Sequence, residues 1–408
     1  MTVFPGKQPL GIVRRCLRYQ LYRPVHVSTL VRDAFLQLNR KIPRKPATPA
    51  TLRFHLDSAM RWLCHAHDAN RDGGVSLSYS FAYGYRASYP ETTGYLIPTF
   101  LRYARLTGDS GFNDRATAMA DWLLSIQMET GSFQAGAIDQ APVPSVFNTG
   151  QILFGLMAMF DHTTDERYLD AAKKAASWLC SIISSDGIWK RFTYHSIPHT
   201  YYARVALALL EVFAATGDNN LKHTAERHFE WVLSRMEGDG WYSDSALEPG
   251  TYPLTHTIVY VIEGLLGGFS ILGNEGYFNA AQSTVDSLVN HLFRFGTISG
   301  EHNISFSRRS GYQCLVGNAQ LSGAILTSPR LAGRKKYMEA AVLLNRQLMA
   351  VQHHSSTEPG IHGGISGSFP VWGAYFPLSF PNWAAKFFAD ALMAHLAIHE
   401  SMRNNHLV

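Results

Sequence analysis

The stretch RYLDAAKKAASWLCSIISSDGIWK at residues 167–190, followed by HTYYARVALALLEVFAATG at 199–217, decides the fold. In the first part, apolar residues return every three or four positions and charged residues fill the other face, as in a helix with one exposed side. The second part is apolar on nearly all sides, which is typical of a buried helix. A Gly-centred turn, DGIWK, separates them. The stretch therefore predicts an outer helix, a turn and an inner helix.

This unit repeats along the chain. Gly-centred segments occur at DGGVS (72–76), TGSFQ (130–134), DGIWK (186–190), DGWYS (239–243), GTISG (296–300) and HGGIS (362–366), and each stands between an amphipathic and a more apolar stretch. Six such pairs cannot bury their apolar faces singly, but they can when stacked side by side. We therefore predict an all-α fold, an α/α toroid of six outer–inner helix pairs with short β segments in its loops. Residues 28–40 predict a further helix and a seventh partial pair. An open α-solenoid is the alternative, which the strongly apolar inner helices disfavour.

Composition fits one large folded domain. Of the 408 residues, 46% are hydrophobic and 16% are charged, against about 25% charged in an average soluble domain, so a mainly disordered chain is excluded. Length alone suggests two or three domains, but the repeat predicts a single toroid catalytic domain over 46–408 behind a basic N-terminal arm over 1–45.

Charge and targeting signals bear on partners and location. The net charge of +5 mildly favours an anionic partner, whereas no dense basic patch of the nucleic-acid-binding type is present. Four scattered cysteines predict free thiols and no metal site. No signal peptide is recognisable, so we expect a cytoplasmic protein, or a periplasmic or secreted one if the true N-terminus is missing. No membrane insertion is expected, and the oligomeric state stays open.

The starts of the inner helices carry unusual polar residues. All inner helices of a toroid run in the same direction, so these positions meet at one mouth. Helix N-termini attract anions. Any single polar residue there is an ordinary helix cap, but His and Tyr are poor caps and are costly to bury alone. A shared site is therefore the more economical interpretation of Glu91, Asn148, His199, His256 and Tyr312.

The loops that lead to this mouth are rich in aromatic and basic residues. Aromatic faces stack on sugar rings, and Arg or Lys pairs with carboxylates. We therefore predict a groove for an anionic polysaccharide or oligosaccharide. Its substrate-binding residues would be Tyr85, Glu91, Trp189, Lys190, Arg191, Tyr194, His195, Trp241, Tyr242, Arg308, Trp372 and Tyr375.

Cleavage of a uronic-acid polymer by β-elimination would suit this set. The enzyme must neutralise the substrate carboxylate, remove the C5 proton and protonate the leaving oxygen. Asn148, His199, His256 and Arg309 can serve the first task, and Tyr312 or a His the others, with no metal or other cofactor.

At successive inner helix starts, FNTGQ (147–151), HTYYAR (199–204), HTIVY (256–260) and RRSGYQCLVGNAQ (308–320) look like those of α/α-toroid polysaccharide lyases acting on glucuronan or alginate. YPETTGYL (89–96) and FPNWAAKFF (380–388) also resemble segments of toroid proteins from bacterial exopolysaccharide gene clusters. The resemblance implies that Tyr312 is base and acid, helped by Asn148, His199, His256 and either Arg308 or Arg309.

Other functions share this fold or this site. A toroidal glycoside hydrolase would use Glu91 and a second carboxyl group, for which no residue is equally well placed, since Glu263 lies two turns into an inner helix. A uronate C5-epimerase would use the same residues as the lyase. A carbohydrate-binding component of an exopolysaccharide system would need no catalytic residue. Isoprenoid cyclases share the ring, but the chain has no clustered Asp motif of their kind.

Overall fold

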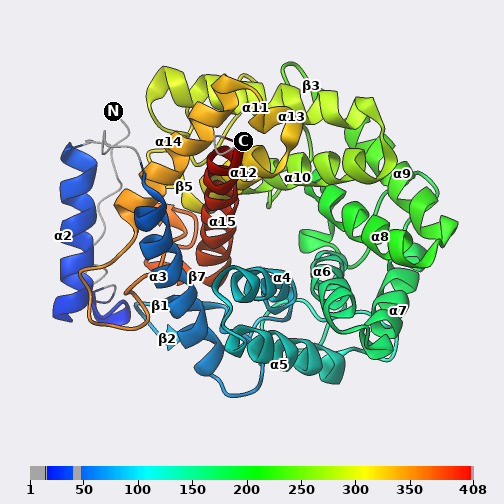
Figure 1. Ribbon diagram of the computed structural model, residues 1–408, viewed down its shortest axis with the longest axis horizontal. Helices are drawn as coiled ribbons and strands as arrows, with labels where there is room; N and C mark the ends of the chain where they lie inside the picture. The colour runs from blue at the N-terminus through cyan, green and yellow to red at the C-terminus, as the bar shows by residue number, and fades with distance from the viewer. Residues whose placement is uncertain (1–13, 15, 40–46, 406–408) are drawn as a thin grey trace.

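The computed structural model describes residues 14, 16–39 and 47–405, and it confirms the α/α toroid. Figure 1 looks down the ring, with one set of helices inside the other. The outer helices are α3 (Pro49–Asp68), α5 (Gly111–Ile126), α7 (Glu166–Ile182), α9 (Asn219–Ser234), α11 (Glu275–Phe295) and α14 (Lys335–Val351). The inner helices are α4 (Pro90–Thr107), α6 (Val146–Thr163), α8 (Ala203–Thr216), α10 (Thr255–Leu272), α12 (Leu315–Thr327) and α15 (Asn382–Asn405).

The ring is closed, so the open solenoid is wrong. The last helix, α15, contacts α12 on one side and α3 and α4 on the other. Strand β1 (Ser78–Ser80) pairs antiparallel with β7 (Ser379–Pro381) and with β2 (Gly84–Tyr85), which joins the first and last repeats. The other predicted short β segments of the loops are β3 (Met236–Glu237), β4 (Trp241–Tyr242), β5 (Gln313–Cys314) and β6 (Ser368–Phe369). The connections also contain the short helices η1 (Tyr194–Ser196), η2 (Thr200–Tyr202) and α13 (Pro329–Ala332).

Glycines let neighbouring inner helices approach closely. A Cβ atom on Gly94 of α4 would lie 2.6 Å from the Cα atom of Ile152 on α6, and one on Gly317 of α12 would lie 2.6 Å from the backbone nitrogen of His256 on α10. A side chain at either position would push the two backbones apart. The diameter of the ring therefore depends on these contacts.

The two ends of the toroid have connections of different length. Inner helices pass to the next outer helix through short turns at 108–110, 164–165, 217–218 and 273–274. Gly108, Gly217 and Gly273 end their helices with φ values of 75°, 72° and 70°, the left-handed conformation that the sequence predicts there. Outer helices pass to inner ones through much longer segments, such as 69–89 and 352–381. Long loops gather at the N-terminal ends of the inner helices.

The helix predicted over residues 28–40 is α2 (Pro24–Asn39). It packs on the outside of the ring (Figure 1) and has no inner partner among the described residues. Arg32 donates hydrogen bonds to the carbonyl oxygens of Ala350, Val351 and Gln352 at the end of α14, at 2.8 to 3.2 Å. This anchors α2 to the last repeat.

Among the described residues, α10 is long and apolar enough to cross a membrane, judged by length and composition. It lies in the inner ring, where 61% of its 18-residue apolar window is buried within the molecule. Its apolar character is accounted for by packing against α8, α11 and α12.

Candidate active site

The structure brings several predicted residues together at the N-terminal ends of the inner helices. Glu91 lies in the first turn of α4, Asn148 in that of α6 and His256 in that of α10. Their side chains are largely buried, with Glu91 8% exposed. The structure therefore places these three residues at the same end of the toroid, as the sequence predicts.

Glu91 is a partly protonated acid in this setting. The Tyr89 hydroxyl donates a hydrogen bond of 2.6 Å to its Oε2 atom. Burial raises the pKa of Glu91 to about 7, against the lowering effects of that hydrogen bond and of the Arg204 charge. The same carboxyl contributes to the raised pKa of Tyr201, Tyr260 and Tyr375, which places it among tyrosines from several elements. Such a carboxyl is about half protonated at neutral pH.

His256 stands on the opposite side of the lumen, on α10. Its Nδ1 atom lies 2.5 Å from Oε1 of Gln320, and its ring centroid lies 4.4 Å from that of Tyr260 and 5.7 Å from that of Tyr375. Burial lowers the pKa of His256 to about 4, so the ring is neutral at pH 7. It can offer a hydrogen bond there but no charge.

Asn148 and His199 are held by the backbone. The Asn148 amide donates to the carbonyl oxygen of Gln134 at 2.8 Å, and Ser145, not Asn148, caps α6. The two ring nitrogens of His199 lie 2.8 Å and 3.2 Å from the carbonyl oxygens of Tyr194 and Ala246. His199 is only 1% exposed. Its position therefore suits the anchoring of loops better than contact with a substrate.

Tyr312 does not have the properties of the predicted base. Its hydroxyl donates a hydrogen bond of 2.8 Å to Oε1 of Glu301. Burial and this carboxylate both raise the pKa of Tyr312, whereas a tyrosine base needs a lowered one. Nearby, Arg309 stacks over the ring of Tyr252, with 5.3 Å between the guanidinium carbon and the ring centroid, and Arg308 reaches the Ser310 carbonyl oxygen at 3.5 Å. The assignment of Tyr312 as base and acid lacks the electrostatics that it requires.

The predicted sugar-binding residues of the loops fall into two groups. Trp189 and Tyr242 are each 1% exposed and belong to the hydrophobic core, so their assignment to the substrate is wrong. Tyr194 and Trp372 are 51% and 42% exposed and remain available. The other predicted residues already have partners within the protein. Among the charged ones, Lys190 pairs with Asp186, Arg191 stacks over Phe192 and His195 faces Glu248. Among the aromatic ones, Tyr85 packs on Tyr79, Trp241 belongs to the β3–β4 hairpin, and Tyr375 accepts a hydrogen bond from Trp383.

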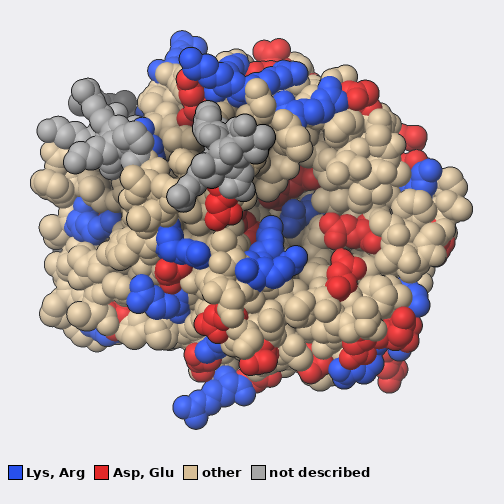
Figure 2. Space-filling model, in the orientation of Figure 1, with Lys and Arg blue, Asp and Glu red and all other residues tan. Residues whose placement is uncertain are grey.

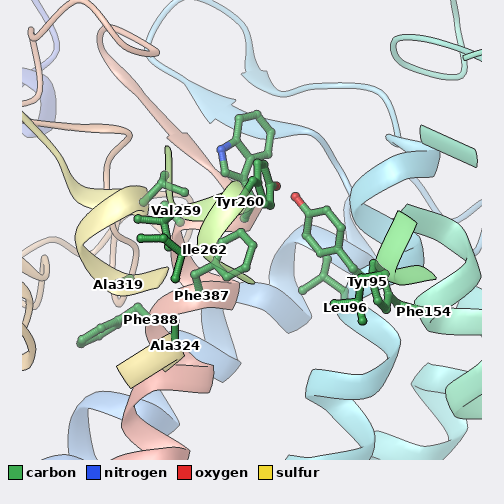
Figure 3. Close-up of a cluster of buried hydrophobic side chains, with 14 of the residues drawn as sticks. Tyr95, Leu96, Phe154, Val259, Tyr260, Ile262, Ala319, Ala324, Phe387 and Phe388 are labelled. Carbon is green, nitrogen blue, oxygen red and sulfur yellow. The ribbon is translucent and has the colours of Figure 1, made fainter. Parts of the chain in front are cut away.

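An aromatic layer closes the lumen just below Glu91 and His256. We call it the waist, and it comprises Tyr95, Phe154, Tyr260 and Phe387, with the Arg204 side chain among them. Figure 3 shows Tyr95 and Tyr260 extending toward each other from α4 and α10. The Arg204 guanidinium carbon lies 4.6 Å from the centroid of Phe154 and 5.4 Å from that of Tyr260. The waist separates the N-terminal mouth from the other half of the lumen.

A large cavity lies beyond the waist, at the C-terminal ends of the inner helices. It has a volume of about 1260 Å³, and its floor includes Tyr95, Phe154, Arg204 and Phe387. Figure 2 shows a hollow in the middle of the face, with acidic and basic side chains around it. The sequence interpretation placed the polar residues at the opposite mouth and missed this cavity.

The residues that the sequence interpretation missed are charged positions inside apolar helices. The Arg204 Nη1 atom lies 2.9 Å from Oε2 of Glu263, and its Nε donates to Gln151 at 2.8 Å. Asp390 of α15 is likewise paired, with Lys386 of the same helix and with Arg102 of α4, each at 2.8 Å. Charged residues are rare in the inner helices, and this rarity could have indicated them from the sequence. An ionisable residue in an otherwise uncharged inner helix must face the lumen or have a charged partner.

The lumen shows no arrangement typical of a metal centre. Within residues 14, 16–39 and 47–405, no group of three or more His, Cys, Asp or Glu side chains could hold a metal ion. The carboxyl groups of the lumen can support acid–base chemistry, and its neutral His and Tyr side chains can form hydrogen bonds.

Comparison with known proteins identifies a family to which the chain is similar. Residues 91–313 match the model described as beta-L-arabinofuranosidase, GH127 catalytic domain. The chain belongs to this family. The matched segment of the GH127-family protein begins at Glu91 and includes Glu301 and Tyr312. No curated protein matches the chain by sequence.

Solved structures show the same fold as this GH127-family protein. An unsaturated glucuronyl hydrolase specific for heparin superposes with a TM-score of 0.68 at 14% identity, covering 86% of this chain and 98% of its own. The unsaturated glucuronyl hydrolase of Bacillus sp. GL1 gives a TM-score of 0.64 at 16% identity, covering 84% and 96%. That of Streptococcus agalactiae gives 0.62 at 13% identity, covering 88% and 94%. At these identities the likeness shows the fold.

These findings correct the sequence-based function. A polysaccharide lyase acting by β-elimination is wrong, because the family to which the chain belongs is one of glycosidase catalytic domains. The expected resemblance holds at the level of an α/α-toroid, carbohydrate-active enzyme. The C5-epimerase alternative relied on the same tyrosine as the lyase and meets the same electrostatic objection at Tyr312.

Proposed function

We propose that the protein is a glycoside hydrolase in which Glu91 is the general acid. The observation that carries this proposal is the state of Glu91, a buried carboxyl whose pKa of about 7 keeps it partly protonated at neutral pH. A glycosidase needs such an acid to protonate the leaving glycosidic oxygen. Glu91 lies at the loop-rich end of the toroid, and functional residues concentrate on such loops.

Glu301 is the second carboxyl group of the proposed mechanism. It lies in the connection between α11 and α12, at the same end as Glu91, and accepts the hydrogen bond of the Tyr312 hydroxyl. Its negative charge contributes to the raised pKa of Tyr312 and Cys314. In hydrolysis, Glu91 gives its proton to the leaving oxygen while water attacks the anomeric carbon, and the proton of that water passes to Glu301. Tyr312 then has a positioning role on Glu301.

The substrate that we propose is a short saccharide or chain end with an acidic sugar. The aromatic and histidine side chains of the mouth suit sugar rings, and the convergent helix N-termini favour a negative group. The structural neighbours are unsaturated glucuronyl hydrolases, and the family model is that of a beta-L-arabinofuranosidase. Unsaturated glucuronyl disaccharides and β-L-arabinofuranosides are therefore the first substrates to test.

The test is a hydrolysis assay with the purified full chain. Release of reducing sugar is measured for both substrate classes, and loss of ultraviolet absorbance is followed for the unsaturated glucuronides. Glu91→Gln is expected to lower kcat by about 10²- to 10⁴-fold, the usual contribution of a general acid. Glu166→Gln, which changes an exposed glutamate in the first turn of α7, is the matched control.

Two outcomes would overturn the proposal. Full activity in Glu91→Gln would remove Glu91 from catalysis. Failure to release sugar from any member of either class, by a folded wild-type protein, would remove the hydrolase assignment. The role of Tyr312 is tested separately: Tyr312→Phe is expected to lower kcat with little change in KM, because Glu301 loses its positioning partner, and to leave the limb of the pH profile that belongs to Glu91 in place.

A further inference from the structure

We propose that the cavity at the C-terminal ends of the inner helices is a second ligand site, which takes a saccharide bearing an ammonium group. It goes beyond the proposed hydrolysis, because the waist stands between this cavity and Glu91. Its size, its floor and its unpaired charges carry the proposal independently.

The cavity has the size and floor of a saccharide site. About 1260 Å³ exceeds the roughly 300–1,000 Å³ of an ordinary small-molecule pocket. Tyr95, Phe154 and Phe387 present aromatic surface at its base, and sugar rings stack on such surface. The walls are formed by the second halves of the inner helices, whose connections at this end are short. The cavity is therefore open to solvent on one side and rigid on the others.

Most charges in the cavity neutralise one another. Arg204 pairs with Glu263 at 2.9 Å, Lys386 and Arg102 pair with Asp390 at 2.8 Å, and at the rim Arg330 pairs with Glu275 at 2.8 Å. These groups already have the partners that burial requires. They fix the shape of the cavity. Because two cations share the single carboxylate of Asp390, this set leaves about one positive charge on the side of α4 and α15.

Two carboxyl groups lack such partners. Glu211 lies on the wall formed by α8, and Asp161 is exposed at the rim on the neighbouring α6. Neither forms an ion pair or a side-chain hydrogen bond with another residue in the described part of the chain. Arg105 on α4 is the lining cation left without an ion pair there. The two unpaired carboxyl groups make the α6–α8 wall the acidic side of a cavity whose total charge is close to zero.

An ammonium group satisfies this wall better than a metal ion does. Two carboxylates without a third ligand do not make a metal site, and no cluster of three was found in the described residues. A primary ammonium has three donors and can bridge two carboxylates in one charge-assisted set of hydrogen bonds. Combined with the aromatic floor, this favours an amino sugar over a neutral or purely anionic one.

Binding would be coupled to a proton on Glu211. Burial, together with the charge of Asp161, raises the pKa of Glu211 to about 7 against the lowering effects of Arg204 and Arg102, and a bound cation favours its ionised form. Affinity is therefore expected to increase as the pH rises toward 7, with release of a proton from Glu211 on binding, and to fall at higher pH, where the ligand's own amine loses its proton. The charged or titratable groups that share the cavity with Glu211 are Arg102 and Arg105 on α4, Asp161 and His162 on α6, Arg204 on α8, Glu263 on α10 and Lys386 and Asp390 on α15.

The experiment is calorimetric titration of the full chain with a glucosamine disaccharide, using its N-acetylated counterpart as the neutral probe. We expect the amine to bind at least about tenfold more tightly than its N-acetylated counterpart, because only the amine can form a charge-assisted hydrogen bond. Glu211→Gln and Asp161→Asn are each expected to weaken binding about tenfold or more. Titration in two buffers of different ionisation enthalpy measures the released proton, which Glu211→Gln should abolish.

Two further variants locate the site. A side chain at Gly323 on α12, which lines the cavity, would meet no atom closer than 3.9 Å at its Cβ position. Gly323→Leu should therefore place a bulky side chain in the cavity without disturbing the helices and should weaken binding. Glu166→Gln is the matched control outside the cavity. Circular dichroism and thermal unfolding of each variant confirm that it is folded.

The outcomes separate the proposals. Equal binding of amine and N-acetyl probes, binding unchanged in Gly323→Leu, or no binding of either probe would each overturn the second site. Glu211→Gln is expected to keep the hydrolytic activity of the wild type, so loss of amine binding with normal hydrolysis supports it. Loss of hydrolysis in Glu91→Gln with normal amine binding would show that the two ends of the lumen act separately.

Discussion

At the scale of single residues, Glu91 couples folding to pH. Its pKa of about 7 in the folded protein lies well above its ordinary value of 4.5. The folded protein thus holds this proton more tightly than the unfolded chain does. The free energy of unfolding therefore decreases between pH 4.5 and 7, and the contribution of Glu91 is flat outside that window.

We predict that Glu91→Gln removes this dependence. Relative to the variant, the wild type should lose up to ~3 kcal/mol of unfolding free energy between pH 4.5 and 8. Urea unfolding at the two pH values measures the difference. An identical pH dependence in both proteins would contradict a raised pKa at Glu91. The hydrolytic activity should likewise fall as the pH rises above 7, because the acid loses its proton.

The pair of Arg204 and Glu263 supports a second residue-scale prediction. Their side chains are 11% and 16% exposed and lie 2.9 Å apart. Glu263→Met would leave a largely buried guanidinium without its carboxylate and should cost up to ~3 kcal/mol of stability. The double variant Arg204→Met/Glu263→Met should recover much of that loss. A double variant that is less stable than Glu263→Met would show that the pair stabilises the waist beyond the mere pairing of charge.

At the scale of helices, the close approach of α4 and α6 is open to test. A Cβ atom on Gly155 of α6 would overlap the carbonyl oxygen of Gly94 on α4. Gly155→Ala should therefore destabilise the protein by about 1–3 kcal/mol, the usual cost of overpacking. Gly323→Ala is the matched control: its Cβ position is open, and alanine in a helix should add about 0.5–1 kcal/mol. Chemical denaturation of both variants measures the contrast, and equal effects would contradict it.

Helix periodicity explains which parts the sequence could predict. The pattern of 167–217 recurs often enough to yield the helix pairs, the end at which Glu91, Asn148 and His256 meet, and the glycine ends at Gly108 and Gly217. Periodicity does not say which way a side chain in a turn points. The sequence therefore predicted that Trp189 contacts a sugar ring. In the structure Trp189 packs in the core, and its indole nitrogen donates a hydrogen bond of 3.0 Å to the Leu179 carbonyl oxygen.

The lumen itself was harder to predict than its mouth. Arg204 and Glu211 are the charged residues of an otherwise apolar helix. Arg204 pairs with Glu263 of another repeat, and the carboxylate that acts on Glu211, Asp161, also comes from another repeat. Such pairings depend on the closure of the ring, which brings together residues far apart in sequence. The assignment of Tyr312 as base failed for the same reason, because the Glu301 carboxylate that raises its pKa becomes visible only in three dimensions.

At the scale of the whole molecule, α15 closes the ring. It packs against α12, α3 and α4, so its removal would expose the apolar faces of the first and last repeats at once. We predict that a chain ending at Pro381 loses cooperative unfolding, measured as the disappearance of a single sharp calorimetric transition. A truncated chain that still unfolds in one transition at the wild-type temperature would contradict this.

The waist makes the cavity at the C-terminal ends of the inner helices a blind socket. A polymer cannot thread through the ring past Tyr95 and Tyr260, so whatever binds in that socket must enter and leave by the same opening. One ligand therefore has to depart before another can take its place.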